Sequence, residues 1–158
     1  MEEIVITSDS TCDLSESQLK ENDIRIMPLS VILGEKTYKD GIDIQPSDIF
    51  RYFDDTGNLP KTAAPSVAEY EEFFRPFVDS GKTVIHFNIS SKASGSHSFA
   101  QTASKSFGGK VYVVDSHALS TGQGLLVMKA CDLRAEGKSA AEIFNAVNSL
   151  REKVNTSF

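Results

Sequence analysis

Small hydroxyl residues follow three short apolar segments of this chain, at the point where each segment ends. The segments 4–6, 84–89 and 111–114 lead into residues 7–11, 90–96 and 115–122, respectively. If the segments are parallel strands of one sheet, all three clusters lie along its carboxyl edge, where open α/β sheets bind their ligands. Hydroxyls and free helix amides are neutral hydrogen-bond donors, so this rim predicts a site for a small anionic or strongly polar group.

A further hydroxyl, that of Thr62, stands in a loop that Pro60 and Pro65 hold extended. Such a loop would present the Thr62 hydroxyl in a fixed direction. The competing interpretation is a connector that ends in Ser66 as a helix cap. Capping is also the alternative at the carboxyl edge, because serine and threonine are common at helix N-termini and Ser94 precedes a predicted helix.

Other chemical motifs are incomplete in this sequence. Residues 81–83 resemble the end of a phosphate-binding loop but precede a strand instead of following one. Gly122 and Gly124 match only half of a dinucleotide-binding fingerprint. The histidines lack metal-ligand spacing, and Cys12 is expected to be a buried apolar residue, so we expect no metal and no cofactor. A hydrolase or phosphatase that uses Asp9 or a rim serine is the remaining enzymatic alternative.

Composition narrows the class of protein. The chain has 158 residues and a formal net charge of −6, which disfavours binding to nucleic acid or to anionic membranes. Its two cysteines are too few for a disulfide framework. An acidic amino terminus leads directly into a strand, and no apolar segment approaches the roughly 20 residues that span a bilayer. We therefore expect no signal peptide, no transmembrane segment and a cytoplasmic location.

Strands and helices alternate along the chain, which predicts an α/β protein with a mostly parallel, doubly wound sheet flanked by helices. Capping pairs are expected to start helices at Asp13, Ser66 and Ser139, each with a glutamate three residues later. The predicted strands are about 3–7, 24–33, 83–89 and 110–114; a hairpin loop covers 34–41 and an irregular loop 55–65. Further helices are predicted at about 46–54, 95–106 and 120–136, the last one apolar on most sides.

An ordered set of motifs in this chain resembles the DegV family. No single motif decides the resemblance, but their order from residue 7 to residue 124 is highly specific. The motifs are TSDSTCDL at 7–14, Pro28-Leu29, YKDG at 38–41, PKT at 60–62, Pro65-Ser66, ISS at 89–91, Ser94-Gly95, VDS at 114–116, and Ser120 with Gly122 and Gly124.

The resemblance implies a carrier that holds a long-chain fatty acid, such as palmitate, between two α/β domains. It places the carboxylate on the hydroxyls of Thr62 and Ser94, with backbone donors of the loop 90–96 beside them. The supporting rim is then Ser91, Gly95, Ser10, Asp9 and Ser116. Some members, the FakB proteins, present their fatty acid to a separate fatty acid kinase subunit that uses ATP.

The resemblance also implies a longer chain, because members of the family continue well beyond residue 158. Residues 1–158 are accordingly expected to be the amino-terminal domain, with a truncated carboxyl-terminal domain and exposed apolar surface where that domain docks. Residues 154–158 look like the start of another strand. No nucleophile stands beside an activating base, so a binding protein is favoured over an enzyme. A purely structural interaction domain is the third interpretation.

Overall fold

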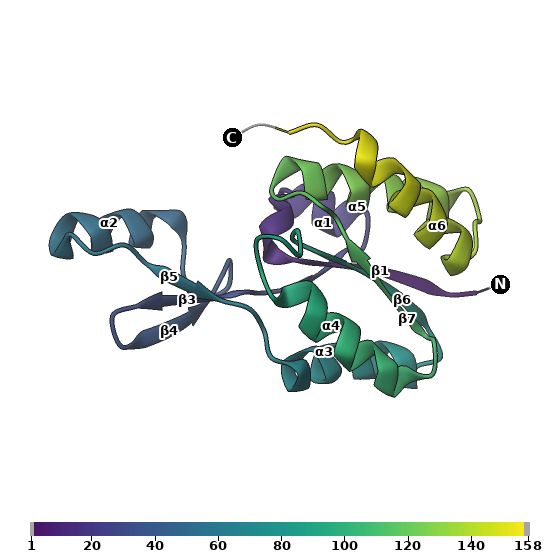
Figure 1. Ribbon diagram of the computed structural model, residues 1–158, viewed down its shortest axis with the longest axis horizontal. Coiled ribbons are helices and arrows are strands. Elements are labelled where there is room, and N and C mark those ends of the chain that lie inside the picture. The colour runs from purple at the N-terminus through teal and green to yellow at the C-terminus, as the bar shows by residue number, and fades with distance from the viewer. Residues whose placement is uncertain (1, 157–158) are drawn as a thin grey trace.

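A four-stranded parallel sheet lies at the centre of the protein (Figure 1). The computed structural model describes residues 2–156. The strand order is β2-β1-β6-β7, and every neighbouring pair is parallel. The two central strands are buried along their whole length, as expected for a sheet covered on both faces. The strands are β1 (Ile4–Asp9), β2 (Arg25–Met27), β6 (Thr83–Asn88) and β7 (Val111–Asp115).

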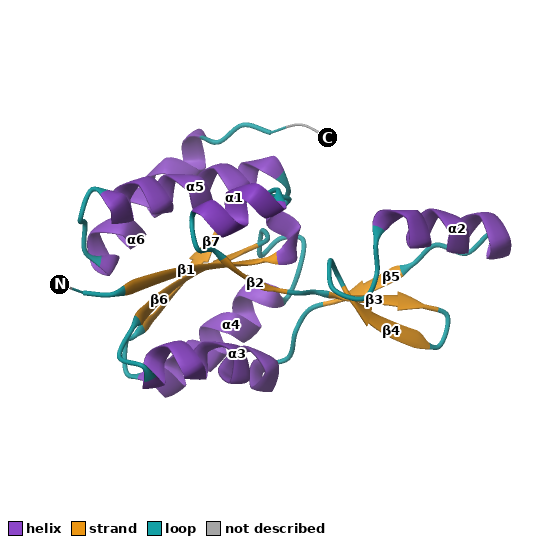
Figure 2. Ribbon diagram, turned by 180° about the vertical axis from the view of Figure 1, so that it is seen from behind, coloured by secondary structure: helices purple, strands orange, loops and turns teal. Residues whose placement is uncertain are grey.

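Helices cover both faces of this sheet, which confirms the predicted doubly wound α/β fold (Figures 1 and 2). One face packs against α1, α5 and α6 and buries a cluster that includes Phe87 and Leu126. The other face packs against α3 and α4 around Phe74 and Val84. These helices are α1 (Glu16–Glu21), α3 (Val67–Asp79), α4 (Ser96–Ser104), α5 (Thr121–Ala135) and α6 (Ala140–Leu150); short 3₁₀ turns are η1 (Ser10–Cys12), η2 (Lys105–Phe107) and η3 (Arg151–Lys153).

A second, antiparallel sheet projects from one end of the parallel sheet together with helix α2 (Figure 1). Its strand order is β4-β3-β5. Gly34 has a φ of 62° in the tight turn between β3 and β4, which confirms the predicted hairpin. The predicted loop 34–41 is too long, because β4 lies within it and pairs with β3 directly after the turn. This unit consists of β3 (Ser30–Leu33), β4 (Lys36–Lys39), α2 (Pro46–Thr56) and β5 (Lys61–Ala63).

The predicted strand 24–33 is wrong, because the chain changes sheets within it. Strand β2 ends at Met27 and β3 begins at Ser30. Pro28 has no N–H to donate, and the Leu29 amide donates to Ser10 Oγ (3.2 Å) instead of to a neighbouring strand. The predicted irregular loop 55–65 is also partly wrong, since β5 lies within it and pairs with β3.

Capping boxes mark where α1, α3 and α6 begin. The predicted boxes at Ser66 with Glu69 and at Ser139 with Glu142 are both confirmed. The predicted start at Asp13 is wrong, because Asp13 has the left-handed φ of 49° and an N-cap needs an extended backbone. Helix α1 is capped two residues later by Ser15, which forms a reciprocal box with Gln18.

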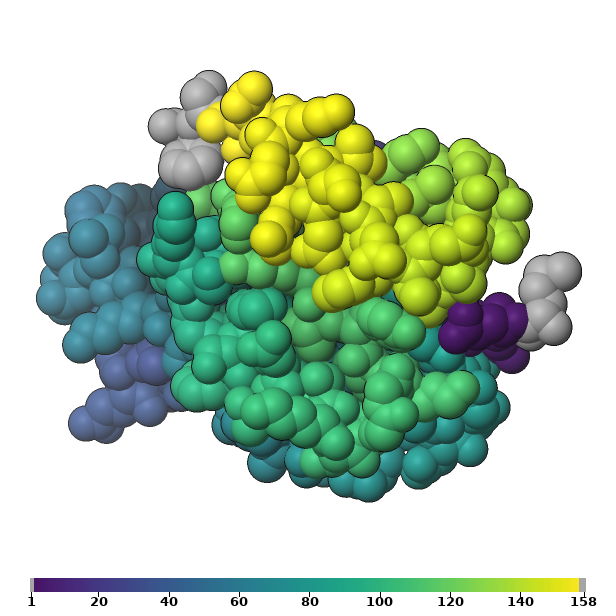
Figure 3. Space-filling model, turned by 45° about the vertical axis from the view of Figure 1, so that its right-hand side comes forward, coloured from purple at the N-terminus to yellow at the C-terminus, as the bar shows by residue number. Residues whose placement is uncertain are grey.

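The carboxyl end of the described chain lies on the α5–α6 side of the parallel sheet, and the antiparallel sheet forms a separate lobe (Figure 3). Residues 154–156 have no regular secondary structure, and the remainder of the expected strand at 154–158 falls outside the described residues. Within residues 2–156, no helix is both long and apolar enough to cross a membrane. The same residues contain no group of three or more potential metal ligands.

Candidate functional site

The three hydroxyl clusters meet at one edge of the parallel sheet, as their positions in the sequence predict. Strands β1, β6 and β7 are direct neighbours, and Asn88 lies opposite Asp115 in the β6–β7 register. The Ser90 amide donates to the Ala118 carbonyl (2.8 Å), which joins the second cluster to the third. The Ser120 amide donates to the Thr11 carbonyl (2.9 Å), which joins the third cluster to the first.

Asp115 fixes the loop that contains the predicted carboxylate contact. One oxygen of its carboxylate accepts hydrogen bonds from the backbone amides of Ser91 (3.1 Å) and His117 (3.2 Å). Burial alone would raise the pKa of Asp115, but the hydrogen bonds from Ser91 and His117 outweigh burial and lower this pKa. The adjacent Ser116 is buried, and its hydroxyl donates to the Ala118 carbonyl (2.9 Å). Both residues therefore hold the shape of the rim.

Ser94 lies half-buried at the start of α4. Its Oγ accepts a hydrogen bond from the Ser96 amide (3.2 Å) and lies 2.9 Å from the Ser96 hydroxyl. Ser94 thus bonds to the first amide of the helix, in agreement with its capping interpretation, although the residue directly before the helix is Gly95. Ser91 and Gly95 are exposed on the same loop.

A buried polar network lies beneath this loop. Asp9 is 0% exposed, and its Oδ1 accepts the hydroxyl proton of Tyr70 (2.8 Å) and lies 3.2 Å from His86 Nε2. Its Oδ2 accepts from the Asn88 side-chain amide (3.0 Å) and from the Ile89 backbone amide (3.3 Å). The carboxylate therefore has a full set of partners inside the protein.

This burial argues against the hydrolase and phosphatase alternative. A nucleophile must reach its substrate, and the Asp9 carboxylate is enclosed by its partners. Among the residues that the structure describes, no serine hydroxyl hydrogen-bonds to a histidine ring. The His117 ring instead faces the carboxylates of Asp115 (3.5 Å) and Glu152 (2.9 Å).

Sequence reasoning missed the partners of Asp9. Tyr70 is buried on α3 and reaches Asp9 through its hydroxyl. His86 and Asn88 are two residues apart on β6, so their side chains point to the same face of the sheet. Thr7 and Asp9 follow the same spacing on β1, and the Thr7 hydroxyl lies 2.8 Å from His86 Nδ1. Polar residues at alternate positions of buried strands were the signal of this network.

Two predicted site residues lie away from the loop at Ser94. Thr62 is exposed on β5 of the antiparallel sheet, where it pairs with Val31. Within the described residues, no hydrogen bond joins Thr62 to Ser94. Ser10 accepts the Leu29 amide proton (3.2 Å) and so braces the point where the chain changes sheets.

A family comparison covers almost the whole chain. A family model described as "Uncharacterised protein, DegV family" matches residues 3–158. The chain belongs to the DegV family. A DegV domain-containing protein of Clostridium acetobutylicum is 37% identical over 148 residues, which are 93% of this chain and 53% of that protein. The chain thus spans about half the length of the curated relatives it matches.

Solved DegV structures share the fold. A DegV family protein from Thermus thermophilus, described for its fatty acid binding, is 32% identical with a TM-score of 0.88, over 95% of this chain and 54% of that chain. A stearic acid-binding protein from Eubacterium ventriosum is 34% identical with a TM-score of 0.81, over 94% of this chain and 52% of that chain.

The glycines of the DegV motif serve close packing in this chain. A Cβ atom built on Gly124 would lie 2.7 Å from the Cys12 carbonyl oxygen, and one on Gly122 would lie 2.9 Å from the Ala118 Cβ. Helix α5 therefore approaches η1 and the third hydroxyl cluster as closely as its backbone allows. This contact, rather than a dinucleotide, accounts for the half-matched fingerprint.

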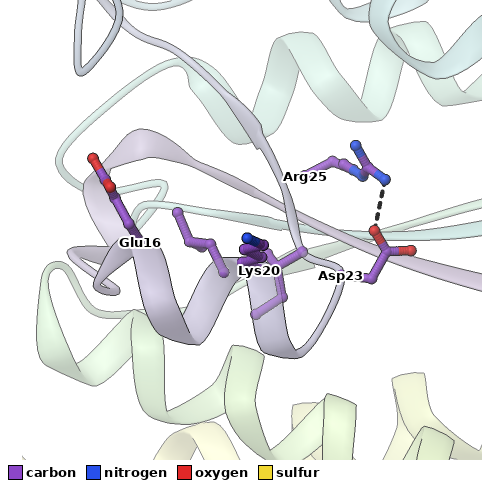
Figure 4. A pocket seen from close by; sticks show the side chains of 6 residues that line it. Glu16, Lys20, Asp23 and Arg25 are labelled. Carbon is purple, nitrogen blue, oxygen red and sulfur yellow. Dashed lines mark hydrogen bonds and ion pairs between the residues drawn. The ribbon is translucent and has the colours of Figure 1, made fainter.

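Cavities lie at both ends of the sheet. One of about 480 Å³ separates the first hydroxyl cluster from the β4–α2 connection and is lined by Ser10, Leu14 and Ile42. One of about 310 Å³ borders the loop at Ser90 and Ala93. A third, of about 400 Å³, lies between α1 and the start of β2, at the opposite, amino edge (Figure 4). Its exposed ion pair, Arg25 with Asp23 (2.6 Å), is typical of an ordinary surface hollow.

Proposed function

We propose that this chain binds a long-chain fatty acid through its carboxylate. The hydroxyls of Ser94 and Thr62 are the proposed carboxylate contacts, with Ser91 and Gly95 beside them on the exposed loop. Asp9, Ser10 and Ser116 brace the rim from within. Two solved relatives above 30% identity, described for fatty acid and stearic acid binding, support this ligand class.

One observation carries the proposal: the half-buried Ser94 hydroxyl at the carboxyl edge of the sheet. Ser96 supports its oxygen through two contacts, and the position at the start of α4 favours a negative charge. A carboxylate accepts several hydrogen bonds at once, and bonds to a charged group are stronger than neutral ones. Neutral donors of this kind suit a fatty acid head group.

The proposal describes a carrier rather than a catalyst. The family resemblance adds a fatty acid kinase subunit as the partner to which the bound fatty acid is presented. A partner that uses ATP implies a cytoplasmic location, and palmitate is the proposed test ligand. Nucleic acid is not a partner in this proposal, because the chain carries a net charge of −6.

We further propose that residues 1–158 are the amino-terminal half of a two-domain protein. Coverage of about half of each relative supports this division. Large apolar side chains are also exposed, as expected for a surface that another domain covers. Those with the largest exposed fractions lie on the antiparallel lobe and on α5: Leu59 (76%), Ile42 (70%), Phe50 (69%) and Leu125 (61%).

Palmitate titration by calorimetry tests the site. Ser94→Ala and Thr62→Val each remove one hydrogen bond to a charged group, worth about 1.5–3 kcal/mol, so each should weaken binding about tenfold or more. Ser98→Ala and Thr37→Val are matched controls, because Ser98 is exposed on α4, the helix that follows Ser94, and Thr37 is exposed on β4, in the same antiparallel sheet as Thr62. Unchanged binding by the Ser94–Thr62 double variant would refute the site.

Mass spectrometry of organic extracts separates the proposed function from its rivals. A carrier should release long-chain fatty acid when the purified protein is extracted. A structural interaction domain would release none. Turnover of generic ester or phosphate substrates that is lost in Asp9→Asn would instead restore the enzymatic alternative.

A further inference from the structure

Lys39 lies where the antiparallel lobe (β3, β4, α2 and β5) meets helix α3. It is the last residue of β4, and its side chain is half-buried. Its Nζ donates to Glu69 Oε1 on α3 (2.8 Å) and to Ser30 Oγ on β3 (3.2 Å). One ammonium group therefore joins the lobe to a helix that packs on the parallel sheet. The motif YKDG at 38–41, which the proposed ligand contacts leave unexplained, supplies this group.

The turn after β4 holds the backbone of Lys39 in place. The Lys39 amide donates to a carboxylate oxygen of Asp43. The Lys39 carbonyl accepts from the amides of Ile42 (3.0 Å) and Asp43 (3.2 Å). Lys39 also lies opposite Ser30 in the β3–β4 register. The side chain of Lys39 thus starts from a fixed backbone.

Both oxygens of the Glu69 carboxylate are engaged. Oε1 accepts from Lys39, and Oε2 accepts from the amide (2.8 Å) and the hydroxyl (2.9 Å) of Ser66. Ser66 is the N-cap of α3, and only Ala64 and Pro65 separate it from β5 (Figure 2). The Lys39–Glu69 pair therefore spans the connection between β5 and α3. It fixes the direction of β5 relative to the helix.

Lys39 is also close in the antiparallel sheet to the proposed contact Thr62. In the β3–β5 register, Ser30 lies opposite Ala63 and Val31 lies opposite Thr62. The hydrogen bond from Lys39 to Ser30 thus ends one residue away from the partner of Thr62. Only β3 separates the strand of Lys39 from the strand that carries Thr62.

Helix α3 continues this series of contacts toward the other proposed contact, Ser94. The hydroxyl of Tyr70, in the first turns of α3, donates to Asp9 Oδ1 (2.8 Å). Asp9 Oδ2 accepts from the Ile89 amide (3.3 Å), directly before the loop that contains Ser94. Consecutive contacts therefore run from the antiparallel lobe to the loop at Ser94.

We propose that Lys39 is a positioning residue, which holds Thr62 in the orientation that lets one carboxylate contact Thr62 and Ser94 together. This step rests on the proposed function. Without the Lys39–Glu69 pair, the lobe would take up more orientations, and only some of them would allow both contacts. The apparent affinity falls in proportion to the fraction of molecules in the competent orientation.

Palmitate titration of Lys39→Gln tests this role. A half-exposed ion pair changes an equilibrium by about two- to fivefold, so palmitate binding should weaken by about that factor. Lys36→Gln is the matched control, because it removes the same charge from an exposed position on β4, and it should bind palmitate like the wild type. Wild-type affinity in Lys39→Gln would overturn the proposal.

Glu69→Gln separates positioning from direct attraction between Lys39 and the carboxylate. This variant breaks the ion pair but keeps the positive charge, and glutamine at this position of a capping box still caps α3. Positioning predicts weaker binding, again by about two- to fivefold. Direct attraction predicts unchanged or stronger binding, because a competing negative charge is removed, and that result would refute positioning.

A double-variant cycle removes the contact that Lys39 is proposed to position. In a Thr62→Val background, Lys39→Gln should cause no further loss of palmitate affinity. A merely structural Lys39 would instead cause the same loss in both backgrounds, and this outcome would contradict the proposal.

A measurement without ligand keeps this role separate from the proposed function. Spin labels attached through Asp54→Cys on α2 and Ser98→Cys on α4 report the orientation of the lobe, because both positions are exposed and both native cysteines are buried. The distribution of distances between the labels should broaden in Lys39→Gln but not in Lys36→Gln. An unchanged distribution would rule out the role of Lys39. If the wild type fails to bind palmitate, the proposed function fails, while the label distances still decide whether Lys39 holds the lobe.

Discussion

Replacing Gly124 with alanine places a methyl group against the backbone of a neighbouring turn. The added Cβ would lie 2.7 Å from the Cys12 carbonyl oxygen and 3.1 Å from Leu14 Cδ2. Alanine favours the helix by about 1 kcal/mol relative to glycine. Overpacking costs about 1–3 kcal/mol, and the upper end applies because a carbonyl oxygen cannot move without its turn.

The expected net loss is therefore about 2 kcal/mol in the free energy of unfolding, or about 4–8 °C in Tm for a chain of this size. Urea unfolding followed by circular dichroism measures this loss. Leu14→Ala in the same chain is the discriminating control, because it removes the nearby side chain but leaves the Cys12 carbonyl. The reasoning is refuted if Gly124→Ala is as stable as the wild type, or if Leu14→Ala restores most of the lost stability.

Three further outcomes are expected from the same structure. The hydrogen bond from Lys39 (2.8 Å) is the main cause that lowers the pKa of Glu69 to about 2. The folded-state pKa lies below the unfolded value, so this stability is present above about pH 4.5 and is lost as the pH falls toward 2. Because Glu69 is 41% exposed, the pair contributes only about 0.5–1 kcal/mol to the free energy of unfolding. Glu69→Gln should therefore lose that much less stability than the wild type between pH 4.5 and pH 2, as measured by urea unfolding. An equal loss of stability in the two proteins would contradict the pairing. Asp9→Asn should lower the free energy of unfolding by about 3 kcal/mol, because it breaks a buried network. A loss as small as that caused by substituting an exposed residue would contradict the network. Burial raises the pKa of Cys131 to about 11 and also raises that of Cys12, so thiol reagents at pH 8 should label both only after urea is added, and rapid labelling of the native chain would argue against burial.

Local signals were sufficient to predict the parallel sheet and most helix starts. Strand β6 has apolar residues at Val84, Ile85 and Phe87, and the Ser66–Glu69 box marks the start of α3 directly in the sequence. The start of α1 was misplaced because the patterns at Asp13 and Ser15 overlap. Only the left-handed backbone of Asp13, which the fold imposes, decides between them.

Features that depend on contacts between residues distant in the sequence could not be predicted. Strand β5 is three residues long and exists because β3 lies beside it, so residues 61–63 alone look like a loop. The position of Ser94, just before a helix at the carboxyl edge of the sheet, was predicted from the sequence. The network beneath Ser94 was not predicted, because the partners of Asp9 on β1 come from α3 and from the end of β6, which are distant in the sequence.

The antiparallel sheet is an insertion in the crossover between β2 and α3, and it carries one of the two proposed carboxylate contacts. Its described links to the parallel sheet include the Ser10–Leu29 hydrogen bond and the half-exposed Lys39–Glu69 pair. A fatty acid held by Thr62 and Ser94 would act as a cross-link between the two sheets. Binding would then restrict the orientation of the antiparallel lobe relative to the parallel sheet, and this loss of freedom would reduce the net binding free energy. Changes at the base of this insertion would therefore alter the affinity without touching either carboxylate contact, because they would change how freely the lobe moves before the fatty acid binds.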